Sequence, residues 1–207
     1  MDIGALLKSF IYLIASSLLY PVLLLLVLLT LWVLVYSGSF FAEWLERLRL
    51  GKYKSEELPA ILREGENMNV FSHRVKNYID RFQRLINGKE QITEVEIEIE
   101  NMIQENTFKI WKSMDFLRIL VRVAPGLGLI GTLIPMGTGL AALGQGDMTK
   151  LTTDLVIAFT TTVVGLTLGI SAFSFYTVKR RWVEEDIKNM ELATEILAEP
   201  LAGGRKK

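Results

Sequence analysis

The sequence predicts an all-α integral membrane protein with three transmembrane helices that are extended by cytoplasmic helices. Half of the 207 residues are apolar although 22% are charged, and the mean hydropathy is positive. No charge occurs in residues 10–36, 123–146 or 155–178. Each run exceeds the roughly 20 residues that a helix needs to cross the hydrocarbon core. The segregation of apolar from charged residues therefore indicates three membrane spans.

Residues 10–36 are expected to form the first transmembrane helix, after a short outer N-terminal turn at 1–9. The run is almost twice as long as the apolar core of a secretory signal, which is about 7–15 residues. It ends in an aromatic belt between Trp32 and Tyr36, as spans often do at a membrane interface. Pro21 lacks an amide hydrogen and should bend or loosen this helix.

Basic residues near the ends of the spans predict the orientation. On one side they are Arg47, Arg49, Lys52, Lys54, Lys109, Lys112, Arg118, Arg122, Lys179, Arg180 and Arg181; the other side has only Lys8 and Lys150. Basic residues are retained in the cytoplasm. We therefore expect the N-terminus outside, residues 37–122 and 179–207 in the cytoplasm, and the protein in the cytoplasmic (inner) membrane.

The cytoplasmic region is predicted to be helical. Residues 40–50 continue the first helix, Gly51 interrupts it, and Ser55 resembles the start of another helix. Residues 70–87 are amphipathic, with Gly88 as the expected C-cap. Their apolar stripe comprises Val75, Tyr78, Ile79, Phe82, Leu85 and Ile86.

The segment 94–100 fits two structures. Its strict alternation of Glu with Val or Ile is the pattern of a strand. However, Thr93 and Glu96 form a capping box. Apolar residues also recur at helical spacing, followed by a stretch without Gly or Pro up to Val123; they are Ile92, Val95, Ile99, Met102 and Ile103. An isolated strand would also have no partner. We predict a helix whose membrane end is the second span.

The second span, 123–146, and the third, 155–178, are joined by a short outer loop at 147–154. After the third span, residues 179–207 are predicted to form an amphipathic cytoplasmic helix and a tail. The apolar positions of this helix are Ile187, Met190, Leu192 and Ile196.

Small and hydroxylated residues form stripes on the second and third spans. These are Gly128, Thr132, Pro135, Gly139 and Ala142 on the second span, then Ala158, Thr162, Gly165, Gly169 and Ala172 on the third, with Thr160, Thr167, Ser171 and Ser174 adjoining. Small residues allow close approach of helices in lipid. The stripes either pack these two helices together or face a central passage or partner helix in a ring of subunits. The first span, rich in Leu and Val, is expected to face lipid.

No ionisable residue lies near the middle of a span, where such residues are costly and usually mark ion pathways. A conducted ion would therefore need a carboxylate from another polypeptide. Asp154 lies at the outer end of the third span. It either stabilises the first turn of that helix or handles an ion.

Two residue types that often carry catalysis or bind metals are absent or rare. Cysteine is absent and His73 is the only histidine, so thiol catalysis, disulfides and thiolate metal sites are excluded. A metal site needs several converging ligands, and His73 is expected to be a solvated surface residue. We expect no enzyme, no metal and no cofactor, and the zero net charge implies no nucleic-acid partner.

Two motifs carry a resemblance to a known family. Residues 124–132, APGLGLIGT, resemble the A-P-x-x-G-L-x-G-T motif of the MotA/TolQ/ExbB proton-channel proteins. Residues 161–172, TTVVGLTLGISA, are similar to that family's A-T-x-x-G-L-x-x-x-I-P-A. The order of one span, a cytoplasmic segment and two further spans also matches.

The resemblance implies a subunit of an ion-conducting stator driven by the proton motive force. Family members form a pentameric ring around a dimer of a single-span partner of the ExbD/TolR/MotB kind, whose membrane Asp carries the proton. Thr132 and Thr162 fall on the threonines that line the ion path, with Thr161 beside them. Pro125 falls on the proline that opens the second span. Such complexes perform mechanical work or drive protein transport.

Two departures mark a divergent member. TolQ and ExbB carry a glutamate five residues before the position of Thr162, where this sequence has Ile157. Residues 134–138, IPMGT, replace the aromatic-Gly pattern after G-T. Two other functions remain open: a non-conducting membrane scaffold that docks a cytoplasmic or envelope complex, and a solute transporter, which would need repeats and a polar midplane site.

Overall fold

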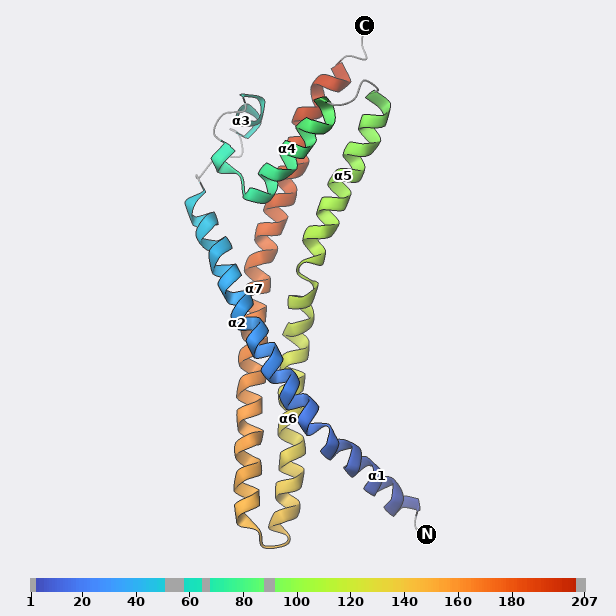
Figure 1. The fold of residues 1–207 in the computed structure, drawn as a ribbon, viewed down its shortest axis with the longest axis vertical. Helices are drawn as coiled ribbons and strands as arrows, with labels where there is room; N and C mark the ends of the chain where they lie inside the picture. Colours follow the sequence, from blue (N-terminus) through green and yellow to red (C-terminus); the bar gives the residue numbers. More distant parts are fainter. Residues whose placement is uncertain (1–2, 51–57, 65–67, 88–91, 204–207) are drawn as a thin grey trace. The chain divides into compact units, whose positions relative to one another are not determined.

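The computed structural model describes residues 3–50, 58–64, 68–87 and 92–203, and every regular element in these residues is a helix (Figure 1). Three helical stretches are long and apolar enough to cross a membrane: Ile3–Arg49, Ile97–Leu143 and Met148–Ala198. The predicted all-α class and number of spans are confirmed.

The chain divides into two compact units. We call Met1–Ser39 with Phe116–Tyr176 the apolar unit, and Phe40–Asp115 with Thr177–Lys207 the polar unit. The helices α2 (Leu19–Arg49) and α7 (Met148–Gly203) contribute residues to both.

The first helical stretch is interrupted before Pro21, as predicted. Helix α1 (Ile3–Ser17) ends one residue before Leu18, and α2 begins at Leu19. Since Pro21 has no amide hydrogen, it cannot bond the carbonyl of Ser17, four residues earlier. The predicted turn at 1–9 is wrong for residues 3–9, which are helical.

One face of α2 is packed and the other is open. Val22 and Leu26 are 5% and 3% exposed, in a core with Leu117, Leu120 and Ala124. By contrast, the side chains of Leu24, Leu25, Val27 and Leu28 are exposed. This open face is the part of the span that can contact lipid.

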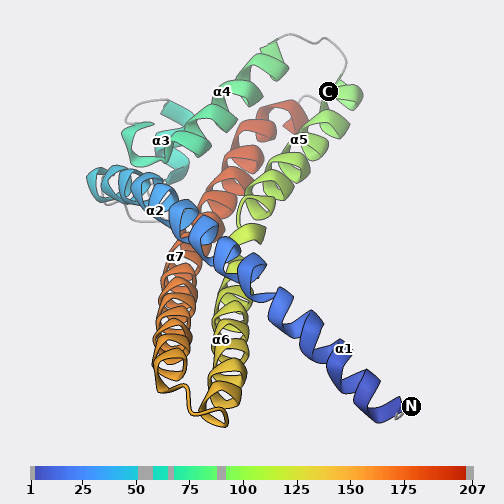
Figure 2. The same cartoon turned by 60° about the horizontal axis from the view of Figure 1, so that its bottom comes forward.

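Helices α6 (Asp115–Leu143) and α7 form an antiparallel hairpin, in which they lie side by side (Figures 1 and 2). Gly146 takes the left-handed backbone conformation in the turn (φ 81°), which glycine adopts without steric cost. The carboxylate Oδ1 of Asp147 accepts the amide of Lys150 at 2.9 Å and caps α7. Residues 148–154, predicted as loop, are therefore helical.

The ambiguous segment at 94–100 is helical, within α5 (Ile92–Lys112). However, the predicted continuous helix up to Val123 is wrong, because α5 and α6 are separated at Ser113 and Met114. The Ser113 hydroxyl donates to the carbonyl of Ile110 at 2.6 Å, a local bond that competes with helical pairing. Met114, 2% exposed, is buried at the interruption.

The polar unit has its own core. It contains α3 (Leu58–Glu64), the short 3₁₀ helix η1 (Met68–Val70), α4 (His73–Asn87), α5, and the end of α7. The predicted stripe of α4 is confirmed, with Val75, Tyr78, Ile79 and Phe82 at most 2% exposed. His73 is exposed, as predicted. The helix start expected at Ser55 and the cap at Gly88 lie outside the described residues.

A buried carboxylate joins three helices of the polar unit. Asp186 of α7 is 1% exposed. It accepts from the guanidinium of Arg47 at 2.5 Å and from the hydroxyl of Ser72 at 2.8 Å. The guanidinium of Arg47 also lies 5.1 Å from the centre of the Trp182 ring. Burial lowers the pKa of the nearby Lys179 ammonium, and the charge of Glu43 opposes this shift.

We expect Asp186→Asn to destabilise the polar unit by about 3–5 kcal/mol, because it removes the carboxylate 2.5 Å from the buried Arg47 and leaves only that of Glu43, at 3.9 Å. Unfolding titrations of the purified protein in mixed micelles, followed by tryptophan fluorescence, would measure the loss. Glu184→Gln is the matched control: Glu184 forms an exposed ion pair with Arg180 on the same helix, and such pairs contribute about 0–1 kcal/mol. Equal effects of the two changes would contradict the role of Asp186.

Candidate functional site

The small-residue stripes meet one another between α6 and α7 of a single chain. A Cβ atom added at Gly165 would lie 2.7 Å from the carbonyl oxygen of Ala124 and 2.7 Å from the Cα of Gly128. One added at Gly169 would lie 2.6 Å from the ring of Pro125. Real Cβ atoms do not approach other atoms so closely, so glycine is required at both positions.

The same contact continues toward the turn of the hairpin. A Cβ atom at Gly139 would lie 3.3 Å from the Cβ of Asp154, and Pro135 is buried. The packing interpretation is therefore confirmed within one chain. The short turn brings the two stripes into antiparallel register. That the stripes also face a partner in a ring of subunits stays a prediction.

A pair of hydroxyls lies at the centre of this contact. Thr132 and Thr162 are within hydrogen-bond reach of each other. The hydroxyl of Thr132 can also donate to the carbonyl of Gly128 at 2.9 Å, and both hydroxyls can donate to that of Ala158 at 3.2 Å. Each hydroxyl has one proton and two lone pairs. The two hydroxyls can therefore bond each other or the carbonyls of Gly128 and Ala158. In each arrangement a hydroxyl donor stays close to these carbonyls.

The neighbouring Thr161 has a different environment. It is 5% exposed, and its hydroxyl donates to backbone carbonyls of its own helix at 2.9 and 3.0 Å. A Cβ atom at Gly131 would lie 2.8 Å from the Cβ of Thr161. Thr161 therefore packs between the helices, and its hydroxyl takes no part in the Thr132–Thr162 pair.

Asp154 belongs to a second polar pair. Its carboxylate Oδ2 accepts the hydroxyl of Thr138 at 2.7 Å, and that hydroxyl also lies 3.0 Å from the carbonyl oxygen of Pro135. The predicted place of Asp154 in the first helical turn is wrong, because α7 begins at Met148 and Asp147 caps it.

Thr138 is a site residue that we did not predict. The antiparallel register could have revealed it: a register that places Thr132 beside Thr162 brings residues near 138 beside Asp154. The structure thus places two polar pairs, one turn of helix or more apart, along the contact between α6 and α7.

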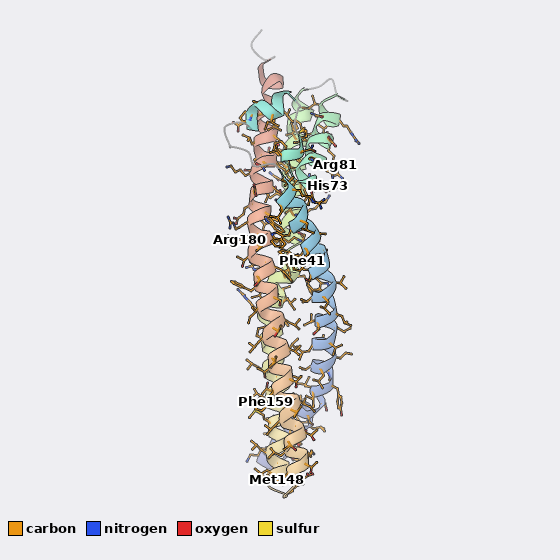
Figure 3. All side chains as sticks on the ribbon, turned by 90° about the vertical axis from the view of Figure 1, so that its left-hand side faces the viewer. Phe41, His73, Arg81, Met148, Phe159 and Arg180 are labelled. Atoms are coloured by element: carbon orange, nitrogen blue, oxygen red, sulfur yellow. The ribbon has the colours of Figure 1, made fainter. Side chains whose placement is uncertain are left out.

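Three of the four hydroxyls that adjoin the stripe of α7 lie on its open side, and Ser171 is half-buried. Thr160, Thr167 and Ser174 are exposed, and the hydroxyl of Thr160 donates to the carbonyl of Val156 at 2.7 Å. Met148 and Phe159 also project from α7 (Figure 3), with 59% and 63% of their surfaces exposed. Within the described ranges, no three His, Asp or Glu side chains gather as a metal site requires.

Comparisons with known proteins agree with the two motifs. The family model of the MotA/TolQ/ExbB proton channel family matches residues 65–192. A biopolymer transport protein ExbB homolog of Methanothermobacter thermautotrophicus is 29% identical over 106 residues, which cover 51% of this chain and 38% of that protein. The match thus spans well under half the length of this relative. No solved structure matches. Because the family model covers more than half of the chain, the chain belongs to the MotA/TolQ/ExbB proton channel family.

Proposed function

We propose that this chain is the ring subunit of an ion-conducting complex that couples an ion gradient, most simply of protons, to mechanical work or transport. The ring is a pentamer around a dimer of a single-span partner of the ExbD/TolR/MotB kind, which supplies a membrane Asp. The N-terminus lies outside and the C-terminus in the cytoplasm. The observation that carries this proposal is the hydroxyl pair of Thr132 and Thr162, located on the family's two motifs.

The two polar pairs support a stepwise ion path along the hairpin. An ion that leaves water loses its hydration and needs polar groups to replace it. Thr138 and Asp154 offer a hydroxyl and a carboxylate near the outer end of the third span. The Thr132–Thr162 pair offers hydroxyls deeper in the span. The partner's carboxylate would then accept the ion.

A non-conducting scaffold is the second candidate. One observation favours it: Gly128, Gly165 and Gly169 all make close contacts within one chain. Helix packing alone therefore explains these glycines, without an ion passage. A scaffold tolerates loss of the polar pairs provided that the helices still pack. A conductor does not.

The proposal is tested by proton flux. The chain and a single-span partner that carries a membrane Asp would be reconstituted into liposomes containing a pH-sensitive dye, with a potassium gradient and valinomycin supplying the potential. We expect proton uptake by liposomes with the wild-type complex. The rate of uptake should decrease at least tenfold for Asp154→Asn, because an amide neither binds a proton at neutral pH nor carries the negative charge of a carboxylate. The absence of flux from the wild-type complex under proton and sodium gradients would favour the scaffold.

Asp147→Asn is the matched control for this experiment. Asp147 is exposed and caps α7, and Asn caps helices as well as Asp does. Flux should therefore be retained. A normal flux in Asp154→Asn would remove Asp154 from the proposed path and leave only the threonine pair.

A further inference from the structure

A pocket of about 340 Å³ lies in the polar unit, between α4, α5 and the end of α7. Its cationic residues are Arg74 and Arg81 of α4 and Lys109 of α5; Figure 3 labels Arg81 on α4. Among the described residues that line this pocket, none is a carboxylate. The formally charged residues of the lining are therefore all positive.

Neutral donors complement the cations. The amide of Asn106 donates one hydrogen to the carbonyl of Met102 at 2.7 Å, and the amide of Asn77 lies 3.1 Å from His73 Nε2. A side-chain amide has two hydrogens, so each retains one for a ligand.

Two of the residues that line the pocket are buried and uncharged. Tyr78 and Met190 are each 2% exposed, and the Tyr78 hydroxyl is 2.6 Å from that of Thr194. Burial raises the pKa of Tyr78, against a smaller lowering by the hydrogen bond with Thr194. The phenol therefore stays protonated at neutral pH and contributes no negative charge to the pocket.

The cations differ in how strongly they are already neutralised. Arg74 is paired with Glu43 at 3.0 Å and lies 3.9 Å from Asp186. Lys109 is paired with Glu105 at 2.6 Å, but both side chains are at least 60% exposed, and water screens such exposed pairs strongly. Arg81 makes no direct ion pair in the described part of the chain. The hydrogen bond and charge of Lys109, with a smaller contribution from the charge of Arg81, lower the pKa of the Glu105 carboxyl. Arg81 and Lys109 therefore share one exposed carboxylate, and one positive charge of the two remains for a ligand.

We propose that this pocket binds a phosphate-bearing anion, held mainly by Arg81 and Lys109 with the amides of Asn77 and Asn106. A guanidinium matches two phosphate oxygens at once, and an ammonium adds a compact positive charge. A soluble phosphate compound and a phospholipid headgroup share this chemistry. The inference goes beyond the proposed function, and it holds whether or not the chain conducts ions.

The test is calorimetric titration of pyrophosphate into the full chain in phosphatidylcholine nanodiscs. We expect saturable binding that Arg81→Gln/Lys109→Gln weakens at least about tenfold, as the loss of ionic hydrogen bonds implies. The control, Arg84→Gln/Lys112→Gln, removes the same charge from exposed positions of the same two helices outside the pocket. It should bind as the wild type does. All three proteins should have the same thermal unfolding midpoint, because the four side chains are exposed.

A second arm distinguishes the two sources of phosphate. If phosphatidylglycerol in the nanodiscs abolishes pyrophosphate binding by the wild type, the occupant is a lipid headgroup; if binding is unchanged, it is a soluble phosphate compound. The proposal is overturned if the wild type binds neither pyrophosphate nor phosphatidylglycerol. It is also overturned if the two double variants lose affinity equally, which would indicate nonspecific charge.

Discussion

Thr162→Val is expected to abolish ion-coupled activity, and Thr132→Val to decrease it at least tenfold, while expression and ring assembly are unchanged. Valine keeps the shape of threonine but has no hydroxyl, so the change separates hydrogen bonding from packing. Either change removes one member of the pair that lies between Gly128 and Ala158 carbonyls. Proton flux in the reconstituted complex and native mass spectrometry of the ring are the two measurements.

Thr160→Val is the matched control. Thr160 lies two residues from Thr162 on the open side of α7, and its hydroxyl donates only within its own helix. It should therefore retain flux. Full ion-coupled function in the Thr132→Val/Thr162→Val double variant would eliminate the proposed path. Loss of flux in Thr160→Val alone would move the path to the open face of α7.

Gly165→Leu is expected to prevent the native packing of α6 on α7, and even Gly165→Ala should destabilise the hairpin by about 1–3 kcal/mol through overpacking. The added methyl group would meet the backbone of Ala124 and Gly128 at 2.7 Å. Backbone atoms cannot move aside as the end of a flexible side chain can. Unfolding titrations in mixed micelles would measure the effect.

Gly126→Ala is the control, for which we expect no loss of stability. A Cβ atom at Gly126, also in the hairpin, has no neighbour within 4 Å. Alanine is favoured over glycine in helices by about 1 kcal/mol, so this change should be neutral or stabilising. A destabilisation of Gly126→Ala as large as that of Gly165→Ala would show that close packing does not explain the glycines.

Features that depend on neighbouring residues along the chain could be predicted from the amino-acid sequence. The three charge-free runs determined the number of spans, because spanning needs only a continuous apolar stretch. Periodicity determined the buried face of α4, and the missing amide of Pro21 determined the break before α2. The two motifs were sufficient for the family. None of these features requires knowledge of what a helix face contacts.

Contacts between helix faces could not be predicted in this way and became visible in the folded chain. The stripes on α6 and α7 were recognisable in the sequence, but their partner was not, since a small-residue stripe suits a helix of the same chain or of another. The turn at Gly146 and Asp147 sets the register, and this register brings Thr138 to Asp154 and Gly165 to Gly128. Asp186 and Arg47, 139 residues apart, likewise meet only after folding. Local patterns are set by neighbours along the chain, whereas such pairs depend on where distant helices begin, turn and align.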